Sequence, residues 1–272
     1  MKYRLMAIDM DGTLLNSHDN ISERNRMALN KVLDKGITVA LSTGRIYKSA
    51  VHYRCLVGLN SPIIACNGAV ISSSDEKEIV YERCIDNDIL KDIITIAESN
   101  NMYYHFYDLS TFYFKKYEDK FKKYHKYYEE NYETQGINII GFNDPVKILS
   151  NNLNFHKLVF IEDDICKLDN LRQKLEKIKG ISVSKSWYNN LEVMSEGVSK
   201  GNALRFLAQM LNIDTSEIVA IGDNENDISM FNVAGLAVAM GNGDELIQKK
   251  AHVITDTNDN DGVAKAIEKY VL

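Results

Sequence analysis

Short apolar runs, each followed at once by polar residues, recur near both ends of this chain. The runs at 3–9, 37–41 and 62–66 are too short for helices, and continuous apolar runs of this length are typical of buried parallel strands. Between the first two runs, apolar residues recur at helical spacing from Ser22, a predicted N-cap, to Gly36, a predicted helix stop. This alternation predicts a parallel sheet with helices on both faces.

The middle of the chain, from about residue 86 to 185, is rich in tyrosine, lysine and asparagine and has a different pattern. It predicts helices at 88–99, 117–134 and 164–179 and strands at 102–107, 111–116, 156–161 and 181–185. Adjacent strands followed by helices predict an α+β unit with an antiparallel sheet. Packing within this unit is expected for two aromatic sets, Tyr103, Tyr104, Phe106, Tyr107, Phe112, Tyr113 and Phe114 in the strands and Tyr124, Tyr127, Tyr128 and Tyr132 in the helix.

The alternating pattern returns at Ser199, after a predicted linker over 186–198. It predicts helices at 200–211, 244–250 and 261–270, a short helix after 227, and strands at 218–221, 236–240 and 252–254. The fold class is therefore α/β, with a Rossmann-like parallel sheet core and an inserted α+β domain. We expect the core domain to comprise residues 1–83 and 190–272, and the inserted domain residues 84–189.

Composition narrows the class of protein. The 272 residues are 45% hydrophobic and 26% charged, as in ordinary globular proteins, and the net charge of −6 argues against a nucleic-acid partner. No apolar run approaches the length of a membrane span, and Asp9 and Asp11 interrupt any signal-peptide core. The four cysteines are scattered, with no Cys-x-x-Cys motif. This usage indicates reduced thiols, and we expect a cytoplasmic protein with no membrane partner.

The first apolar run ends in the sequence Asp-Met-Asp-Gly-Thr-Leu at 9–14. Two carboxylates two residues apart at a strand end can meet one ligand from one loop, one as a nucleophile or metal ligand and the other moving protons. A plain turn is the alternative. A calcium loop is disfavoured because Thr13, Leu14 and Leu15 follow where further oxygen ligands are needed.

Three later segments favour an active-site loop over a plain turn. Ser-Thr-Gly-Arg at 42–45 follows the second strand, Lys200 begins a helix, and Gly-Asp-Asn-Glu-Asn-Asp at 222–227 follows the strand at 218–221. Clustered carboxylates bind Mg²⁺ together with substrate phosphate oxygens, whereas lysine, hydroxyl and helix N-terminal amide groups bind phosphate itself. The four segments therefore predict a phosphate site beside a divalent cation.

These segments resemble the four motifs of the haloacid dehalogenase superfamily of phosphatases. The spacing and the mid-chain insertion are similar to the Cof-like subfamily, which has a large α/β cap domain. Asn-Gly-Ala at 67–69 and Asp-Gly-Val-Ala at 261–264 also match the subfamily pattern. The resemblance covers essentially the whole chain, with no departure at a catalytic position.

The resemblance implies a role for each matching residue. Asp9 is the nucleophile that forms an aspartyl-phosphate, and Asp11 is the general acid and then the general base. Thr43 and Lys200 hold the phosphoryl group, and Asn226 contacts phosphate or supports the metal shell. The implied Mg²⁺ ligands are Asp9, the backbone carbonyl of Asp11, Asp223 and Asp227. The alternative role implied for Asp227 is to orient Lys200 or a metal-bound water.

Four further residues belong to the expected substrate-binding set with less specific signals. Gly12 allows the loop to turn tightly and approach a ligand, and Gly44 follows Thr43. Arg45 is expected at the rim of the site, although a surface charge at a helix start gives the same pattern. Asn67 is either a site residue or a turn former with Gly68.

The expected function is a Mg²⁺-dependent phosphatase for a small phosphorylated metabolite, such as a sugar phosphate, FMN or pyridoxal phosphate. A phosphomutase on a phosphosugar is one alternative, because resembling enzymes use the same aspartate pair. A non-catalytic regulatory protein on the same scaffold is another. We expect a monomer or a homodimer.

Overall fold

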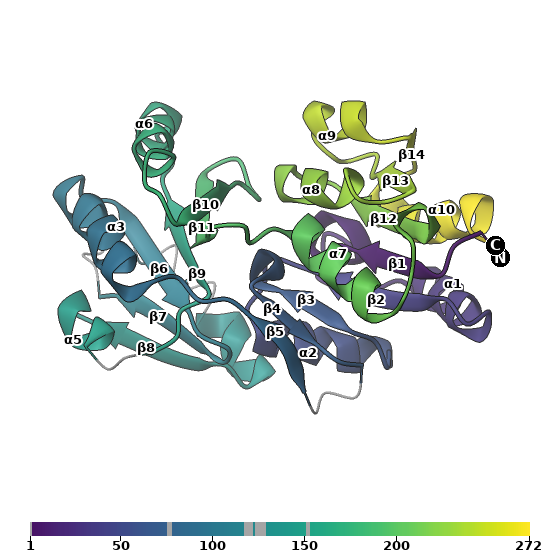
Figure 1. Ribbon diagram of the computed structural model, residues 1–272, viewed down its shortest axis with the longest axis horizontal. Helices are drawn as coiled ribbons and strands as arrows, with labels where there is room; N and C mark the ends of the chain where they lie inside the picture. The colour runs from purple at the N-terminus through teal and green to yellow at the C-terminus, as the bar shows by residue number, and fades with distance from the viewer. Residues whose placement is uncertain (1, 75–77, 117–121, 123–128, 151–152) are drawn as a thin grey trace. The chain divides into compact units, whose positions relative to one another are not determined.

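The structure, a computed structural model, describes residues 2–74, 78–116, 122, 129–150 and 153–272 (Figure 1). The chain forms two compact units. The first unit comprises Met1–Gly44, Tyr53–Tyr81 and Ser199–Leu272, and the second comprises Arg45–His52 and Glu82–Val198. The boundaries between them fall after Gly44, inside the helix α2 (Tyr47–Val57), after Tyr81 and after Val198.

Among the described residues, eight strands form the sheet of the first unit in the order β14-β13-β12-β1-β2-β3-β4-β5. They are β1 (Leu5–Ile8), β2 (Thr38–Ser42), β3 (Ile63–Ala65), β4 (Val70–Ser72), β5 (Ile79–Glu82), β12 (Ile218–Gly222), β13 (Leu236–Ala239) and β14 (Val253–Ile254). The strands from β14 to β3 are parallel, and β4 is antiparallel to β3. The α/β fold class with a parallel core sheet is confirmed.

Helices cover both faces of this sheet because its strands are apolar on both sides. The described helices that lie wholly in the first unit are α1 (Glu23–Asp34), α7 (Lys200–Met210), α8 (Ile228–Phe231), α9 (Glu245–Lys250) and α10 (Gly262–Tyr270). Buried side chains of α1 and α10 pack with Ile8, Leu41 and Ile221 on one face. Side chains of α7, α8 and α9 pack with Ala7 and Ala220 on the other. Burial on both faces explains why these strands appear in the sequence as continuous apolar runs.

In the second unit, six strands of the described chain form a sheet in the order β10-β11-β9-β6-β7-β8. They are β6 (Tyr103–Tyr107), β7 (Thr111–Lys115), β8 (Asn138–Phe142), β9 (Lys157–Ile161), β10 (Ile181–Ser184) and β11 (Asn190–Ser195). The helices α3 (Asn87–Ser99), α5 (Pro145–Leu149) and α6 (Ile165–Leu175) pack on one face of the sheet. The aromatic residues of β6 and β7 are buried, as expected.

Three expectations for the second unit are wrong. Its sheet is mixed, because β7 and β8 are parallel. The linker expected over 186–198 contains β11. Its charged residue Glu192 is buried, with Oε1 2.7 Å from Nζ of Lys157. A charged residue at a buried position interrupts the apolar pattern that would have predicted a strand. The strand β8 was not expected because its Asn-Ile-Ile-Gly-Phe sequence lacks alternation.

Part of the predicted helix at 117–134, with Tyr124, Tyr127 and Tyr128, lies outside the described residues. Among the residues that are described, no helix is long and apolar enough to cross a membrane.

Candidate active site

Asp9 lies at the carboxyl end of β1, the strand between β12 and β2. Ile8 is in register with Ile221 of β12 and with Leu41 of β2, so the ends of all three strands are level. The Asp9 amide donates to the Ile221 carbonyl oxygen at 3.0 Å, which extends the pairing by one residue. The Asp9 residue is only 5% exposed. The strand order therefore places this carboxylate at the carboxyl-terminal edge of the sheet, where ligands of open α/β sheets bind.

The chain turns sharply directly after Asp9, over Met10–Leu14. Gly12 has φ +73°, and a Cβ atom at this position would lie 2.4 Å from Oδ2 of Asp223. Glycine is therefore needed here both for the backbone angle and for the space. Asp11 is exposed within the turn, whereas Thr13 is buried and donates from Oγ1 to Oδ1 of Asp223 at 2.9 Å. The turn thus buries one aspartate and presents the other to solvent.

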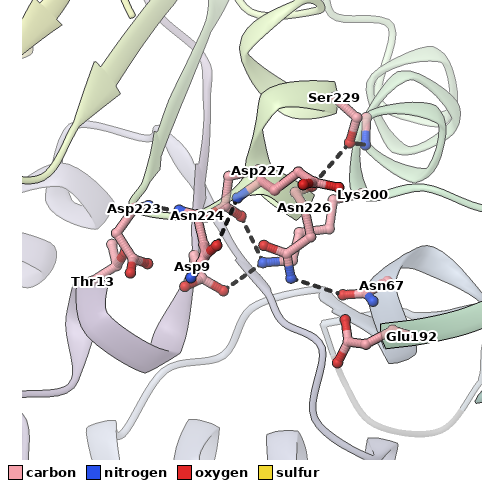
Figure 2. Close-up of polar contacts among 12 residues, drawn as sticks. Asp9, Thr13, Asn67, Glu192, Lys200, Asp223, Asn224, Asn226, Asp227 and Ser229 are labelled. Carbon is pink, nitrogen blue, oxygen red and sulfur yellow. Dashed lines mark hydrogen bonds and ion pairs between the residues drawn. The ribbon is translucent and has the colours of Figure 1, made fainter. Parts of the chain in front are cut away.

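Lys200 places its ammonium group between two buried carboxylates (Figure 2). Its Nζ donates to Oδ1 of Asp9 and to Oδ1 of Asp227, both at 2.6 Å. The lysine is 1% exposed although it is the first residue of α7. Ser199 caps this helix by accepting from the Asn202 amide, which fixes where the helix begins and hence where Lys200 lies.

Asp227 uses its second oxygen to hold the loop that follows β12. Oδ2 accepts from the amides of Asp223 at 3.0 Å and of Asn224 at 3.2 Å. Asp227 is fully buried, and these bonds together with the bond from Lys200 occupy both of its carboxylate oxygens. Asp227 therefore fixes the position of both Lys200 and Asp223.

The charges of this group are unbalanced, with three aspartates around one lysine. Burial first, and then Asp227, raises the pKa of Asp9 well above its usual range, although Lys200 opposes the shift. Burial and Asp227 likewise raise the pKa of Asp223 to about 7. Burial lowers the pKa of Lys200, but Asp227 and Asp9 outweigh it and raise the pKa overall. The protein alone thus stabilises neither Asp9 nor Asp223 as an anion.

This excess of acid fits a divalent cation. Asp9, Asp223 and Asp227 each offer one carboxylate oxygen, and these oxygens all lie within 4.8 Å of one another. A donor set made only of carboxylates suits a hard ion such as Mg²⁺. A cation at this point would also offset the charge that burial leaves uncompensated.

A second polar group is built from the ends of β2 and β3. Thr43 is buried, and its carbonyl oxygen accepts from the Asn67 amide at 3.0 Å. The Asn67 side chain accepts from Nδ2 of Asn226 at 3.2 Å. Asn67 and Cys66 both have positive φ, 56° and 49°, a backbone conformation uncommon outside glycine. Thr43, Asn67 and Asn226 are therefore linked, and Gly44 follows Thr43 in the same unit.

Arg45 stays a prediction, because it belongs to the second unit. Two residues that the sequence analysis did not select contribute to the site. Nδ2 of Asn242 donates to the Gly12 carbonyl oxygen at 2.8 Å. Oγ of Ser229 accepts from the Gly201 amide and donates to the Asn226 carbonyl oxygen. The Gly-Asn-Gly sequence at 241–243, directly after the strand expected at 236–240, was the available signal for Asn242, whereas Ser229 gives none.

The chain matches a family model described as haloacid dehalogenase-like hydrolase over residues 6–267. It is 32% identical over 270 residues to the 5-amino-6-(5-phospho-D-ribitylamino)uracil phosphatase YcsE of Bacillus subtilis, covering 99% of this chain and 96% of that protein. It is also 32% identical to the phosphatase YwpJ of the same organism, over 99% of this chain and all of that protein.

Solved structures give the same family. A haloacid dehalogenase-like hydrolase from B. subtilis superimposes with a TM-score of 0.90 at 31% identity over the whole of both chains. One from Bacteroides thetaiotaomicron superimposes with a TM-score of 0.83 at 32% identity, covering 98% of this chain and 99% of that one.

Proposed function

This chain belongs to the haloacid dehalogenase-like hydrolase family, and from that premise we propose that it is a Mg²⁺-dependent phosphatase for small phosphorylated metabolites. The family is one of hydrolases, and similar proteins are named phosphatases. The observation that carries the proposal is the buried Lys200 ammonium, 2.6 Å from both Asp9 and Asp227, with Asp223 alongside. A positive group beside a buried carboxylate at a strand end suits nucleophilic attack on a phosphate.

In the proposed reaction, a carboxylate oxygen of Asp9 attacks phosphorus while the bond from phosphorus to the ester oxygen breaks. Asp11 gives its proton to the departing oxygen. Asp11 then takes a proton from water as the water oxygen attacks the aspartyl-phosphate, which releases inorganic phosphate and restores Asp9. The exposure of Asp11 suits this exchange of protons with both substrate and water.

The other residues act by position. Lys200 offsets charge on the phosphoryl group and favours ionised Asp9, and Thr43 supplies a hydroxyl. Asn67 and Asn226 hold each other beside Thr43. Gly12 permits the turn, while Gly44 and Arg45 belong to the proposed substrate-binding set. Most of the catalytic effect in such a transfer comes from positioning and charge compensation.

Asp9, the Asp11 carbonyl and Asp223 would hold the Mg²⁺ directly. When bound, this ion would offset the repulsion between the Asp9 carboxylate and the phosphate dianion. Because both Asp227 oxygens already accept hydrogen bonds, we assign Asp227 to orient Lys200 and Asp223 rather than to bind the ion directly.

We propose sugar phosphates and phosphorylated cofactors such as FMN or pyridoxal phosphate as the substrate class. The compound named for YcsE belongs in the same test set, because that protein is similar along its whole length. We also propose a cytoplasmic location and a monomer or homodimer, which size-exclusion chromatography with light scattering distinguishes.

The test measures inorganic phosphate released from this panel with Mg²⁺ and with chelator, for the wild type and for Asp9→Asn. Asp34→Asn, at an exposed position at the end of α1, is the matched control. We expect Mg²⁺-dependent release that Asp9→Asn abolishes and Asp34→Asn keeps.

Near-normal release by Asp9→Asn would exclude the covalent mechanism. Release that is equal with chelator would exclude the Mg²⁺ requirement. Isomerised phosphosugar without free phosphate would identify a mutase instead.

A further inference from the structure

A mixed set of three side chains lies together in the second unit and takes no part in the proposed phosphatase reaction. Glu82 ends β5, Cys84 follows two residues later, and His156 directly precedes β9. Each offers one ligand atom, and these atoms all lie within 4.8 Å of one another. The Ile85 amide donates to the Phe155 carbonyl oxygen at 2.8 Å, which holds the two chain segments side by side.

His156 is the buried member of this set. Its side chain is 1% exposed, and Nε2 lies 2.7 Å from Oε1 of Glu82. Its Nδ1 is buried and has no hydrogen-bond partner among the described residues. A neutral imidazole that carries its proton on Nδ1 has a lone pair on Nε2. Nε2 is the nitrogen that faces Glu82, so it is the atom that can bind a metal ion in place of the shared proton.

We propose that Glu82, Cys84 and His156 bind a transition-metal dication, with Zn²⁺ favoured. The set combines sulfur, nitrogen and oxygen, which is a donor combination found for Zn²⁺ and differs from the all-oxygen set that Mg²⁺ prefers. Glu82 is exposed and Cys84 is partly exposed, so solvent can reach the group and supply a fourth ligand.

The distances need only small adjustments to accommodate such an ion. In a tetrahedral site with metal–ligand distances of about 2.0–2.3 Å, neighbouring ligand atoms lie about 3.3–3.8 Å apart. Sγ of Cys84 is 4.0 Å from Oε1 of Glu82, and Nε2 of His156 is 2.7 Å from the same oxygen. The first distance would shorten by a few tenths of an ångström and the second would lengthen, since a metal ion replaces the shared proton.

Metal binding would also release protons. Burial, followed by the charge of Glu82, raises the pKa of the Cys84 thiol to about 11, so the metal-free thiol carries its proton at neutral pH. On binding, the sulfur–hydrogen bond breaks, the electron pair goes to the metal and the proton goes to solvent. Apparent affinity should therefore rise with pH.

The site would have a structural consequence. Glu82 and Cys84 belong to the segment that connects the two units in sequence, and His156 belongs to the sheet of the second unit. A shared ion would fix this segment to β9 by bonds in addition to the backbone pairing of Ile85. It would thereby raise the melting temperature of the metal-loaded protein.

The test uses reduced full-length protein in excess Mg²⁺, so that the all-carboxylate group is occupied. Co²⁺ reports thiolate ligation through its sulfur-to-metal charge-transfer band, and competition with a chromogenic chelator gives the Zn²⁺ affinity. Cys84→Ser and His156→Gln are compared with Cys166→Ser, an exposed cysteine of the same unit.

We expect a thiolate–Co²⁺ band in the wild type and in Cys166→Ser that is absent from Cys84→Ser. Loss of either ligand should weaken Zn²⁺ binding at least about 10-fold, since even supporting residues of metal sites have effects of that size. Cys84→Ser should keep Mg²⁺-dependent phosphate release, so this result and that of the phosphatase test are independent.

Equal Zn²⁺ affinity in the wild type and Cys84→Ser, or no thiolate–Co²⁺ band, would overturn the proposal. The three residues would then be only a hydrogen-bonded Glu–His pair with a neighbouring thiol. If His156→Gln fails to fold, the Cys84→Ser comparison alone decides, because serine retains nearly the same shape.

Discussion

Replacing Lys200 with methionine measures how much this lysine contributes to the free energy of unfolding by compensating the buried aspartates. The change keeps a chain of similar length and removes the ammonium group that bonds to Asp9 and Asp227, which are only 5% and 0% exposed. Breaking a buried ion pair by removing one partner typically costs about 3–5 kcal/mol, because a charge stays buried without compensation.

The matched control is Lys249→Met. Lys249 forms an exposed pair with Glu245 one helical turn away, at 2.6 Å. Such pairs contribute only about 0.3–0.5 kcal/mol despite the short distance. Urea denaturation followed by far-ultraviolet circular dichroism, without metal at pH 7.5, should therefore show a loss roughly ten times larger for Lys200→Met than for Lys249→Met.

The pH dependence provides a second check. The pKa of Asp9 is already raised by burial, and the loss of Lys200 removes the group that opposes this shift. A carboxyl whose pKa is raised on folding destabilises the native state as pH increases from the unfolded value towards the folded one. The deficit of Lys200→Met should therefore shrink as pH falls from 8 towards 5.

A loss below about 1 kcal/mol that does not change with pH would refute this reasoning. It would mean that Asp9 and Asp227 find other partners or water when the lysine is gone.

Three further predictions concern the turn, the cation and the second unit. Gly12→Ala should lose most phosphate release, because its Cβ would meet Asp223. The control Gly36→Ala has a similar φ of +75° but open space around its Cβ, so it should lose only about 1 kcal/mol of stability, and equal activity in the two variants would contradict this. Because burial raises the pKa of Asp223 to about 7, protons compete with cations below that pH, so Mg²⁺ should raise the melting temperature more at pH 8 than at pH 5.5, and an equal rise would argue against Asp223 as a ligand. Burial lowers the pKa of His105 well below 6.5, so stability should fall as pH drops through 6.5 by up to about 1.4 kcal/mol per unit relative to His105→Gln, as urea denaturation at pH 7 and 5 would show; parallel pH profiles would contradict it.

The first unit was predictable because its strands are buried on both faces. Continuous apolar runs fixed the positions of β1, β2 and β12, and polar residues directly after them marked the candidate site. The N-cap role expected for Ser22 is confirmed by the Asn25 amide, which donates to its side chain. The local sequence was enough at these points, because a helix cap and a continuous apolar run can both be recognised from a few neighbouring residues.

The sheet of the second unit was less predictable because long-range pairing decides it. Glu192 is buried only because Lys157, on a different strand, donates to it, and no local pattern contains that information. The parallel pairing of β7 with β8 depends on a crossover of about twenty residues. Asn242 and Ser229 belong to the same category, since each supports the site through a partner distant in sequence.

The order of strands in the first unit has a consequence for how the protein is made. β1 pairs with β12, which follows the whole second unit in sequence. Leu5 therefore cannot pair with Ile218 until the second unit has been synthesised. During synthesis, residues 82–198 emerge as one continuous stretch and can assemble their sheet before that pairing is possible. Until then β1 exposes an apolar edge able to pair wrongly. The strand that carries Asp9 therefore gains its second neighbour late, and contacts this distant in sequence make folding slow.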